Sequence, residues 1–128
     1  MAELKIITET GMFHSACRCQ WGSEVQWYGF KPQWHLWPVS PGYVDRSDRT
    51  ALINHFISFD IDDGTLRSAV RRVSSDYRDA TYGLMVKDCV SFSADVARAA
   101  GLRLPLVNIT PAGFIAILAV WNTYSATG

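Results

Sequence analysis

Apolar and polar positions alternate through much of the first half of the chain, a pattern typical of half-buried β-strands. The run LKIITET alternates weakly and predicts a first strand that stops at Gly11. The runs MFHSACRCQW and EVQWYGF flank a Gly-Ser pair, which predicts a β-hairpin. The run HFISFDID alternates clearly and predicts another strand. The first half therefore indicates an antiparallel sheet.

The segment from Lys31 to Asp48 does not follow this alternation. It holds three of the five prolines of the chain, with Trp34 and Trp37 between them. We therefore expect an irregular, aromatic-rich excursion. Two interpretations stay open for Trp34, His35 and Trp37: they pin a long loop to the core, or they form one wall of a substrate cleft.

After the strands, the period changes to that of an amphipathic helix. Thr65 is a suitable N-cap for a first helix. The apolar stripe of this helix comprises Leu66, Val70, Val73 and Tyr77. Its other faces carry Arg67, Arg71 and Arg72, which we interpret as a solvated surface.

Two more helices are predicted near the C-terminus. The first has Asp88 as N-cap, runs from Cys89 to about Ala100, and is followed by Gly101. The last begins at a Thr110-Pro111 pair, with the cap and the first-turn proline in their preferred places. Its stripe, which we expect to close the core, is Phe114, Leu118 and Trp121. The predicted fold class is α+β, a small antiparallel sheet packed against about three helices.

Composition adds limits to this picture. The 128 residues are the size of one domain, spanning 1–128, and 48% hydrophobic against 19% charged residues is the balance of a chain with a core. Twelve basic and twelve acidic residues cancel, so no global field attracts nucleic acid, and we expect no nucleic-acid partner. The longest apolar run, FIAILAVW, is too short to span a bilayer, so no integral membrane segment is expected.

The N-terminal run MAELKIITET has charges where a signal peptide needs its apolar stretch. We therefore expect the protein to be made in the cytoplasm without a signal peptide. Export by a specialised secretion system remains compatible with this expectation.

The three cysteines do not form a disulfide or zinc pattern. Cys17 and Cys19 lie two residues apart, and we interpret them as semi-buried strand residues rather than metal ligands. No metal or other cofactor is expected.

Cys89 is the residue with chemical interest. It shares an inward helix face with Phe92, Val96 and Ala100, and it lies on the first turn. Unpaired N–H groups and the helix dipole stabilise a thiolate at that position, while the charge of Asp88 opposes it unless that carboxylate is occupied in capping. Cys89 is accordingly either a nucleophile or an inert buried thiol.

A thiol nucleophile needs a histidine as general base. His14 is the best placed, because it opens the first hairpin strand on the face opposite Cys17 and Cys19. His55 is the second choice and His35 the third.

A third residue would orient the imidazole. The second hairpin strand offers Gln26 and Tyr28 on parity, and the amide oxygen of Gln26 is the better acceptor for a ring N–H.

Together these residues resemble a known superfamily. A histidine opening a hairpin, a YGF-x-P segment closing it, and a late DCVSF at a helix start are similar to the circularly permuted papain-like proteins. These include the NlpC/P60-like and lecithin–retinol-acyltransferase-like cysteine hydrolases and transferases. The resemblance covers roughly residues 11 to 101, and the histidine precedes the cysteine, as in the permuted order. Met12 and Phe13 stand where many such families have Gly-His or Asn-His.

The resemblance implies Cys89 as nucleophile, His14 as base and a polar third residue, Gln26 by position. The implied reaction is cleavage of an amide bond through a thioester, with peptide stems of peptidoglycan as the leading substrate. Some members are antibacterial effectors neutralised by a cognate immunity protein. Two alternatives remain: an acyltransferase, thioesterase or deubiquitinase-like enzyme of the same fold, or a non-catalytic binding module.

Overall fold

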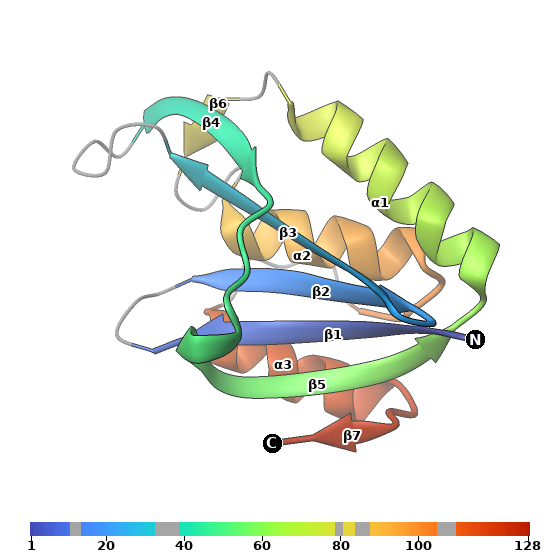
Figure 1. Ribbon diagram of the computed structural model, residues 1–128. Coiled ribbons are helices and arrows are strands. Elements are labelled where there is room, and N and C mark those ends of the chain that lie inside the picture. The colour runs from blue at the N-terminus through green and yellow to red at the C-terminus, as the bar shows by residue number, and fades with distance from the viewer. Residues whose placement is uncertain (11–13, 33–38, 79–80, 84–87, 105–109) are drawn as a thin grey trace.

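Seven strands form one antiparallel sheet in the computed structural model, which describes residues 1–10, 14–32, 39–78, 81–83, 88–104 and 110–128 (Figure 1). Their order across the sheet is β6-β4-β3-β2-β1-β5-β7. In chain order they are β1 (Ala2–Glu9), β2 (Ser15–Trp21), β3 (Glu24–Pro32), β4 (Val39–Asp45), β5 (Ile53–Ile61), β6 (Thr81–Gly83) and β7 (Ala126–Thr127). Among the described residues, three of the six pairings, β1-β2, β2-β3 and β3-β4, join strands that are consecutive in sequence, and the other three join strands that are not.

β1 is a central strand, paired with β2 on one side and β5 on the other. Leu4 and Ile6 point to the main core, whereas Ile7 belongs to a smaller cluster on the opposite face with Ala16 and Trp27. β2 and β3 form the predicted hairpin, and Gly22 takes a positive φ of 59° in its turn. Glycine suits this conformation because it has no Cβ to clash with the backbone.

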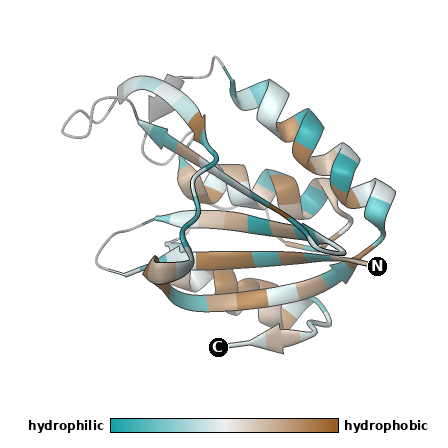
Figure 2. Ribbon diagram, in the orientation of Figure 1, coloured by the Kyte–Doolittle hydropathy of each residue, from teal (hydrophilic) through white to brown (hydrophobic). Residues whose placement is uncertain are grey.

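Three helices cover one face of the sheet: α1 (Asp63–Tyr77), α2 (Cys89–Ala99) and α3 (Pro111–Trp121). A single 3-10 turn, η1 (Thr50–Leu52), precedes β5. Figure 2 shows the contrast between α1, where hydrophilic and hydrophobic residues alternate around the helix, and the more hydrophobic α3. The main core combines apolar side chains from all three helices with those of the helix-facing side of the sheet.

Most of the predicted elements are confirmed. The α+β class is correct, and the stripes Leu66–Tyr77 on α1 and Cys89–Ala100 on α2 are buried at their predicted positions. Asp88 caps α2, and Gly101 follows its end with a φ of 94°. Thr110 caps α3, with Pro111 in the first turn. The intrinsic signals of caps and periodicity were thus strong enough to place the helices.

Four expectations were wrong in detail. The N-cap of α1 is Asp62 rather than Thr65, because the Asp62 carboxylate accepts hydrogen bonds from the N–H and hydroxyl of Thr65. Part of the expected irregular excursion is β4, which pairs with β3. Trp121 is 51% exposed and does not close the core. Cys17 and Cys19 are fully buried rather than semi-buried, because they face the helices.

Trp34, His35 and Trp37 lie outside the described residues, as do Met12 and Phe13. Within the described chain, no helix has the length and apolar character needed to cross a bilayer.

Candidate active site

Cys89 is the first residue of α2 and is 3% exposed. The Asp88 carboxylate accepts a hydrogen bond of 2.9 Å from the Ser91 N–H, which fixes the helix start. Burial raises the pKa of the Cys89 thiol to about 11. Hydrogen bonds from the backbone N–H groups of Ser15, Val90 and Cys89 itself oppose this rise, while the charge of Asp88 adds to it. Burial outweighs the first-turn effect, and Asp88 hinders thiolate formation.

The contact between Cys89 and Ser15 follows from how the sheet opens. The pairing of β2 with β3 runs from Trp21 and Glu24 to Cys17 and Tyr28, and Ser15 lies beyond its end. β3 diverges from β2 there toward β4, and α2 lies behind the two strands (Figure 1). The Ser15 N–H therefore hydrogen-bonds the sulfur of Cys89. The end of β2 thus becomes one wall around the thiol.

Two serines hold the same helix against β2. The hydroxyls of Ser15 and Ser93 are 3.0 Å apart, and both side chains are fully buried. The thiol of Cys17 donates to the hydroxyl of Ser93 over 3.6 Å. These polar contacts fix the position of α2 along the strand and hence the position of Cys89.

His14 immediately precedes β2 and is 4% exposed. The backbone of His14 is bonded to the end of β1: the Glu9 N–H donates to the His14 carbonyl over 3.1 Å. Its side chain lies over β3: a Cβ added at Gly29 would be 3.6 Å from His14 Nε2. This is the sheet face opposite the helices, so the predicted relation of His14 to Cys17 and Cys19 is confirmed.

His14 is neutral in this environment. Burial lowers its pKa to about 4, and the positive charges of Lys31 and Arg49 lower it as well. The negative charge of Glu9 acts in the opposite direction. Its Nε2 is 3.9 Å from Glu9 Oε1 and has no hydrogen-bond partner among the described residues. A neutral imidazole can accept a proton, so His14 has the protonation state that a general base needs at pH 7.

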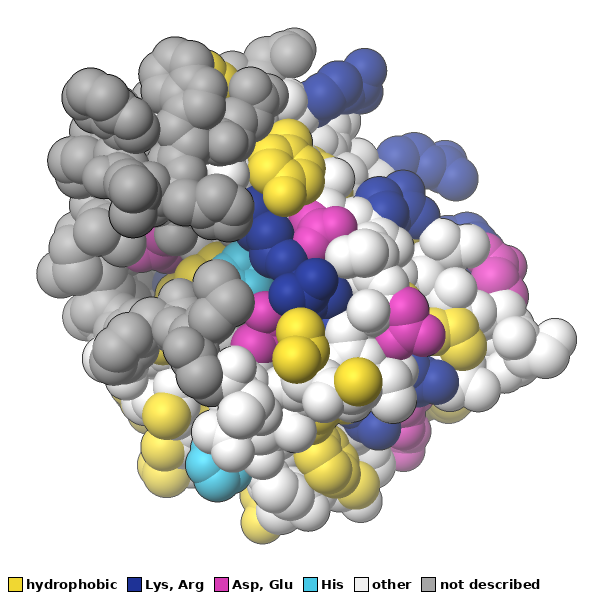
Figure 3. All heavy atoms as spheres, turned by 60° about the vertical axis from the view of Figure 1, so that its left-hand side comes forward, with side chains coloured by type: hydrophobic (Ala, Val, Ile, Leu, Met, Phe, Trp, Pro, Cys, Tyr) yellow, Lys and Arg dark blue, Asp and Glu magenta, His cyan; other side chains and the backbone are white. Residues whose placement is uncertain are grey.

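A cluster of charged side chains, of which Glu9 is fully buried and the others partly exposed, surrounds His14. Figure 3 shows basic and acidic side chains gathered around a histidine on this side of the molecule. Glu9 accepts two hydrogen bonds from Arg49, of 2.7 and 3.0 Å. Lys31 pairs with Asp45 at 2.6 Å. Burial would raise the pKa of Glu9, but the Arg49 hydrogen bonds and nearby positive charges hold it below its ordinary value. Glu9 and Asp45 balance the charges of Arg49 and Lys31, so the cluster is neutral with His14 uncharged.

Gln26 does not lie beside His14, contrary to the prediction. It pairs with Cys19, and Tyr28 pairs with Cys17, so both share the face of the cysteines rather than that of His14. The side-chain oxygen of Gln26 accepts a hydrogen bond of 2.6 Å from Arg46 instead. The prediction failed because the hairpin register was taken with the wrong parity, and a one-residue change moves a side chain to the other face.

Glu9 is the carboxylate next to His14, and sequence reasoning missed it. The pairing of β1 with β2 explains this contact: Thr8 lies opposite Ser15, which brings Glu9 and His14 together at the next position.

The other candidate histidines do not join this site. His55 is exposed on β5, where its N–H donates to the Thr8 hydroxyl over 3.2 Å. His35 lies outside the described residues. Among the residues that the structure describes, no group of three or more His, Cys, Asp or Glu side chains could hold a metal ion.

Comparison with known proteins gives no match: no protein-family model, curated protein or solved structure is similar to this chain.

Proposed function

We propose that this protein is a cysteine hydrolase of the permuted papain-like type, with Cys89 as nucleophile and His14 as general base. The observation that carries the proposal is the hydrogen bond between the Cys89 sulfur and the N–H of Ser15, the residue next to His14 in the chain. The start of α2, which carries Cys89, lies beside the chain segment that carries the buried His14, and this proximity of the two backbones supports the proposal. The His14 ring lies on the sheet face opposite the helices, so catalysis requires it to reach the sulfur around the open end of β2.

Glu9 replaces Gln26 in this proposal as the residue that supports His14. At 3.9 Å its carboxylate is beyond hydrogen-bond distance from Nε2, but it is the nearest charge that favours the imidazolium. When His14 takes up a proton during the reaction, the negative charge of Glu9 stabilises the resulting cation. Glu9 is therefore a positioning and electrostatic residue rather than a catalytic one.

The reaction steps follow from these roles. The Cys89 thiol passes its proton to His14 while the sulfur attacks the amide carbon, giving a tetrahedral oxyanion. Backbone N–H groups at the start of α2 are suited to stabilise that oxyanion. The intermediate collapses to a thioester, and the leaving nitrogen takes the proton from His14. Water then attacks the thioester with His14 as base, which releases the acid and restores the thiol.

The resting protonation states favour this order of events. With a thiol pKa of about 11 and an imidazole pKa of about 4, the pair rests at pH 7 as a neutral thiol and a neutral imidazole. The proton is therefore transferred during the attack, and no thiolate–imidazolium pair is formed beforehand. Proton transfer from a thiol with a pKa of about 11 to an imidazole with a pKa of about 4 is unfavourable by itself, so it must be coupled to formation of the bond between sulfur and the carbonyl carbon.

The proposed substrate is an amide bond in a peptidoglycan peptide stem, and the biological setting is that of an antibacterial effector with a cognate immunity protein. Both rest on the family resemblance of the sequence. The same dyad would serve acyl transfer, thioester hydrolysis or removal of a protein modifier, so these activities are the next substrates to assay.

One observation favours a non-catalytic binding module instead. Cys89 and His14 are 3% and 4% exposed, so a substrate reaches them only if neighbouring groups move. On this alternative, Cys89 is a packing residue of α2 and His14 a buried strand residue.

Digestion of purified peptidoglycan, with released peptides identified by mass spectrometry, tests the proposal. We expect Cys89→Ala to lower the rate by about a thousandfold or more and His14→Ala to do the same, because the two act as a unit. Cys19→Ala and His55→Ala are matched controls, and we expect both to keep the wild-type product pattern. Full activity in folded Cys89→Ala would exclude the proposal and leave the binding module.

A further inference from the structure

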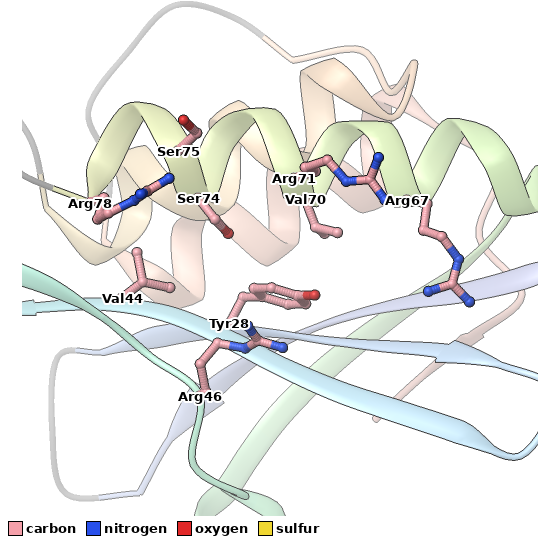
Figure 4. A pocket seen from close by; sticks show the side chains of 9 residues that line it. All are labelled: Tyr28, Val44, Arg46, Arg67, Val70, Arg71, Ser74, Ser75 and Arg78. Atoms are coloured by element: carbon pink, nitrogen blue, oxygen red, sulfur yellow. The ribbon is translucent and has the colours of Figure 1, made fainter.

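A hollow lies between α1 and the sheet, and Cys89 does not line it (Figure 4). It has a volume of about 420 Å³. Its charged lining consists of four arginines, namely Arg46 from the segment after β4 and Arg67, Arg71 and Arg78 from α1 and its end. Hydroxyl groups come from Tyr28, Ser74 and Ser75, and apolar wall from Val44 and Val70.

The basic residues of α1 recur at a spacing that puts them on one side of the helix. Arg67, Arg71 and Arg78 are at i, i+4 and i+11, which follows the helical period. The sequence pattern suggested a solvated surface for Arg67 and Arg71. They are exposed, but they also line this hollow opposite Tyr28.

Positive charge in the hollow is largely uncompensated. Arg67 pairs with Glu24 at 3.0 Å. Among the described residues, Arg46 donates to two neutral acceptors, the Trp27 carbonyl at 2.8 Å and the Gln26 side-chain oxygen at 2.6 Å. Within the described part of the chain, no carboxylate lies within 4.0 Å of the Arg46, Arg71 or Arg78 guanidinium groups. Of the four arginines that line the hollow, Arg67 is thus the one that pairs with a described carboxylate.

Two of the arginines are held in place before any ligand binds. The Arg46 guanidinium lies 4.2 Å from the centre of the Tyr28 ring, and that of Arg67 lies 4.3 Å from the Trp21 ring. Figure 4 shows the Tyr28 side chain in the hollow, between Arg46, on the segment after β4, and the helix that carries Arg71. Fixed guanidinium groups lose little conformational entropy on binding. Their donors are partly engaged by Glu24, Gln26 and the Trp27 carbonyl, so Arg71, which no described hydrogen bond holds, is the one best suited to bind an oxyanion.

One hydroxyl group that lines the hollow has no partner among the described residues. The hydroxyl of Ser74 is buried and has no hydrogen-bond partner within the described residues. Its side chain points from α1 toward the sheet (Figure 4). A buried hydroxyl without a partner is costly, and an anionic oxygen in the hollow would satisfy it.

We infer that this hollow binds a phosphorylated small molecule, with the phosphate groups held by Arg46, Arg67 and Arg71 near the Tyr28 hydroxyl and the organic part against Val44 and Val70. Phosphate fits better than a single carboxylate, because it offers several charged oxygens to several guanidinium forks. The volume exceeds what one phosphate fills and is within the range of small-ligand pockets. This inference is independent of the proposed hydrolase.

Titration calorimetry of the full chain with inorganic pyrophosphate tests the inference. We expect saturable binding with one site, weakened at raised salt, and tighter than the binding of inorganic phosphate alone. Arg71→Gln should weaken binding about tenfold or more, because it removes a charged hydrogen-bond donor. Arg71 is the suitable choice, since no described hydrogen bond or ion pair holds it and the variant should fold.

Arg72→Gln is the matched control: it removes the same charge from the neighbouring position of α1, which does not line the hollow. It should change the affinity by less than about threefold, an effect of net charge only. An equal loss in both variants, or no saturable binding of pyrophosphate, would overturn the inference. Equally tight binding of citrate would overturn the assignment to phosphate and leave a general anion site.

Discussion

The two faces of the β1–β2 strand pair differ in the side chains that cover them. The helix face is closed by apolar side chains such as Leu4, Ile6 and Phe59, which are at most 1% exposed. At one end of the other face, Glu9 and His14 are almost equally buried but polar. Apolar burial stabilises a fold by itself, whereas buried charge costs free energy unless each group is paired. At the charged end Glu9 and Lys31 are each paired, and the buried polar atom without a partner among the described residues is His14 Nε2.

Cys89 lies at the boundary between these two regions. It belongs to the apolar core by burial, yet its sulfur contacts the backbone beside His14. In the proposed mechanism, the helix face supplies the thiol and the polar end supplies the base. The predictions that follow test whether the two faces really differ in this way, beginning with the largest expected effect.

Replacing Glu9 with glutamine should destabilise the protein by about 3 kcal/mol, because Arg49 loses the carboxylate that compensates its charge. The measurement is urea unfolding at pH 7. Glu3→Gln on the same strand is the control: its pair with Arg18 is partly exposed, so we expect less than about 1 kcal/mol. Equal losses in the two variants would show that the buried cluster has no special energetic weight.

The stability of the fold should fall in mild acid because of His14. Its folded pKa of about 4 lies below the ordinary 6.5, so between these values the unfolded chain binds a proton that the folded chain does not. Stability therefore falls as the pH drops through this window. From pH 7 to pH 5 we expect a loss of about 2 kcal/mol attributable to His14.

Urea unfolding of His14→Gln at both pH values checks this expectation. The variant should show a pH dependence smaller by about that amount, whereas the exposed-residue control His55→Gln should keep the wild-type dependence. An unchanged pH dependence in His14→Gln would contradict a neutral buried imidazole.

Removing the Tyr77 hydroxyl, on the helix side of the sheet, should lower the free energy of unfolding by less than the changes at Glu9 and His14. The Tyr77 hydroxyl donates to the Asp95 carboxylate over 2.6 Å, and the ring packs edge-on against Phe30 and Phe92. Tyr77→Phe keeps the rings together and leaves Asp95 half-exposed, so urea unfolding should show a loss of only about 1 kcal/mol. Tyr77→Ala, which removes the ring, should cost about 3–5 kcal/mol. Similar losses for the two variants would mean that the hydrogen bond, not the packing, holds this part of the core.

The sequence predicted the helices well and the site only in part. Caps such as Asp88 and Thr110, and the stripe that includes Cys89, are local signals, and the structure bears them out. The partner of His14 depends on which strands pair and with what parity, and this information is not local. That is why Gln26 was expected where Glu9 lies.

The protonation state of Cys89 also depended on information absent from its own helix. The first-turn position favours a thiolate and the charge of Asp88 opposes it, so the sequence alone leaves the direction of the pKa shift open. Burial beneath the end of β2 raises the pKa, and only the packing of the sheet reveals this. The arginines of α1 show the same limit: their helical spacing is plain in the sequence, but Tyr28 and Arg46 on the other wall are brought to them by the fold.

The most direct test of the central claim is the alkylation rate of Cys89 as a function of pH, in the wild type and in His14→Ala, with modification quantified by peptide mapping. If His14 is the general base, the variant should react at least about tenfold more slowly at pH 7. The difference should narrow as the pH rises toward the thiol pKa of about 11, because hydroxide then removes the proton instead. Equal rates at pH 7, or a rate ratio that does not change with pH, would contradict the account and make Cys89 a packing residue.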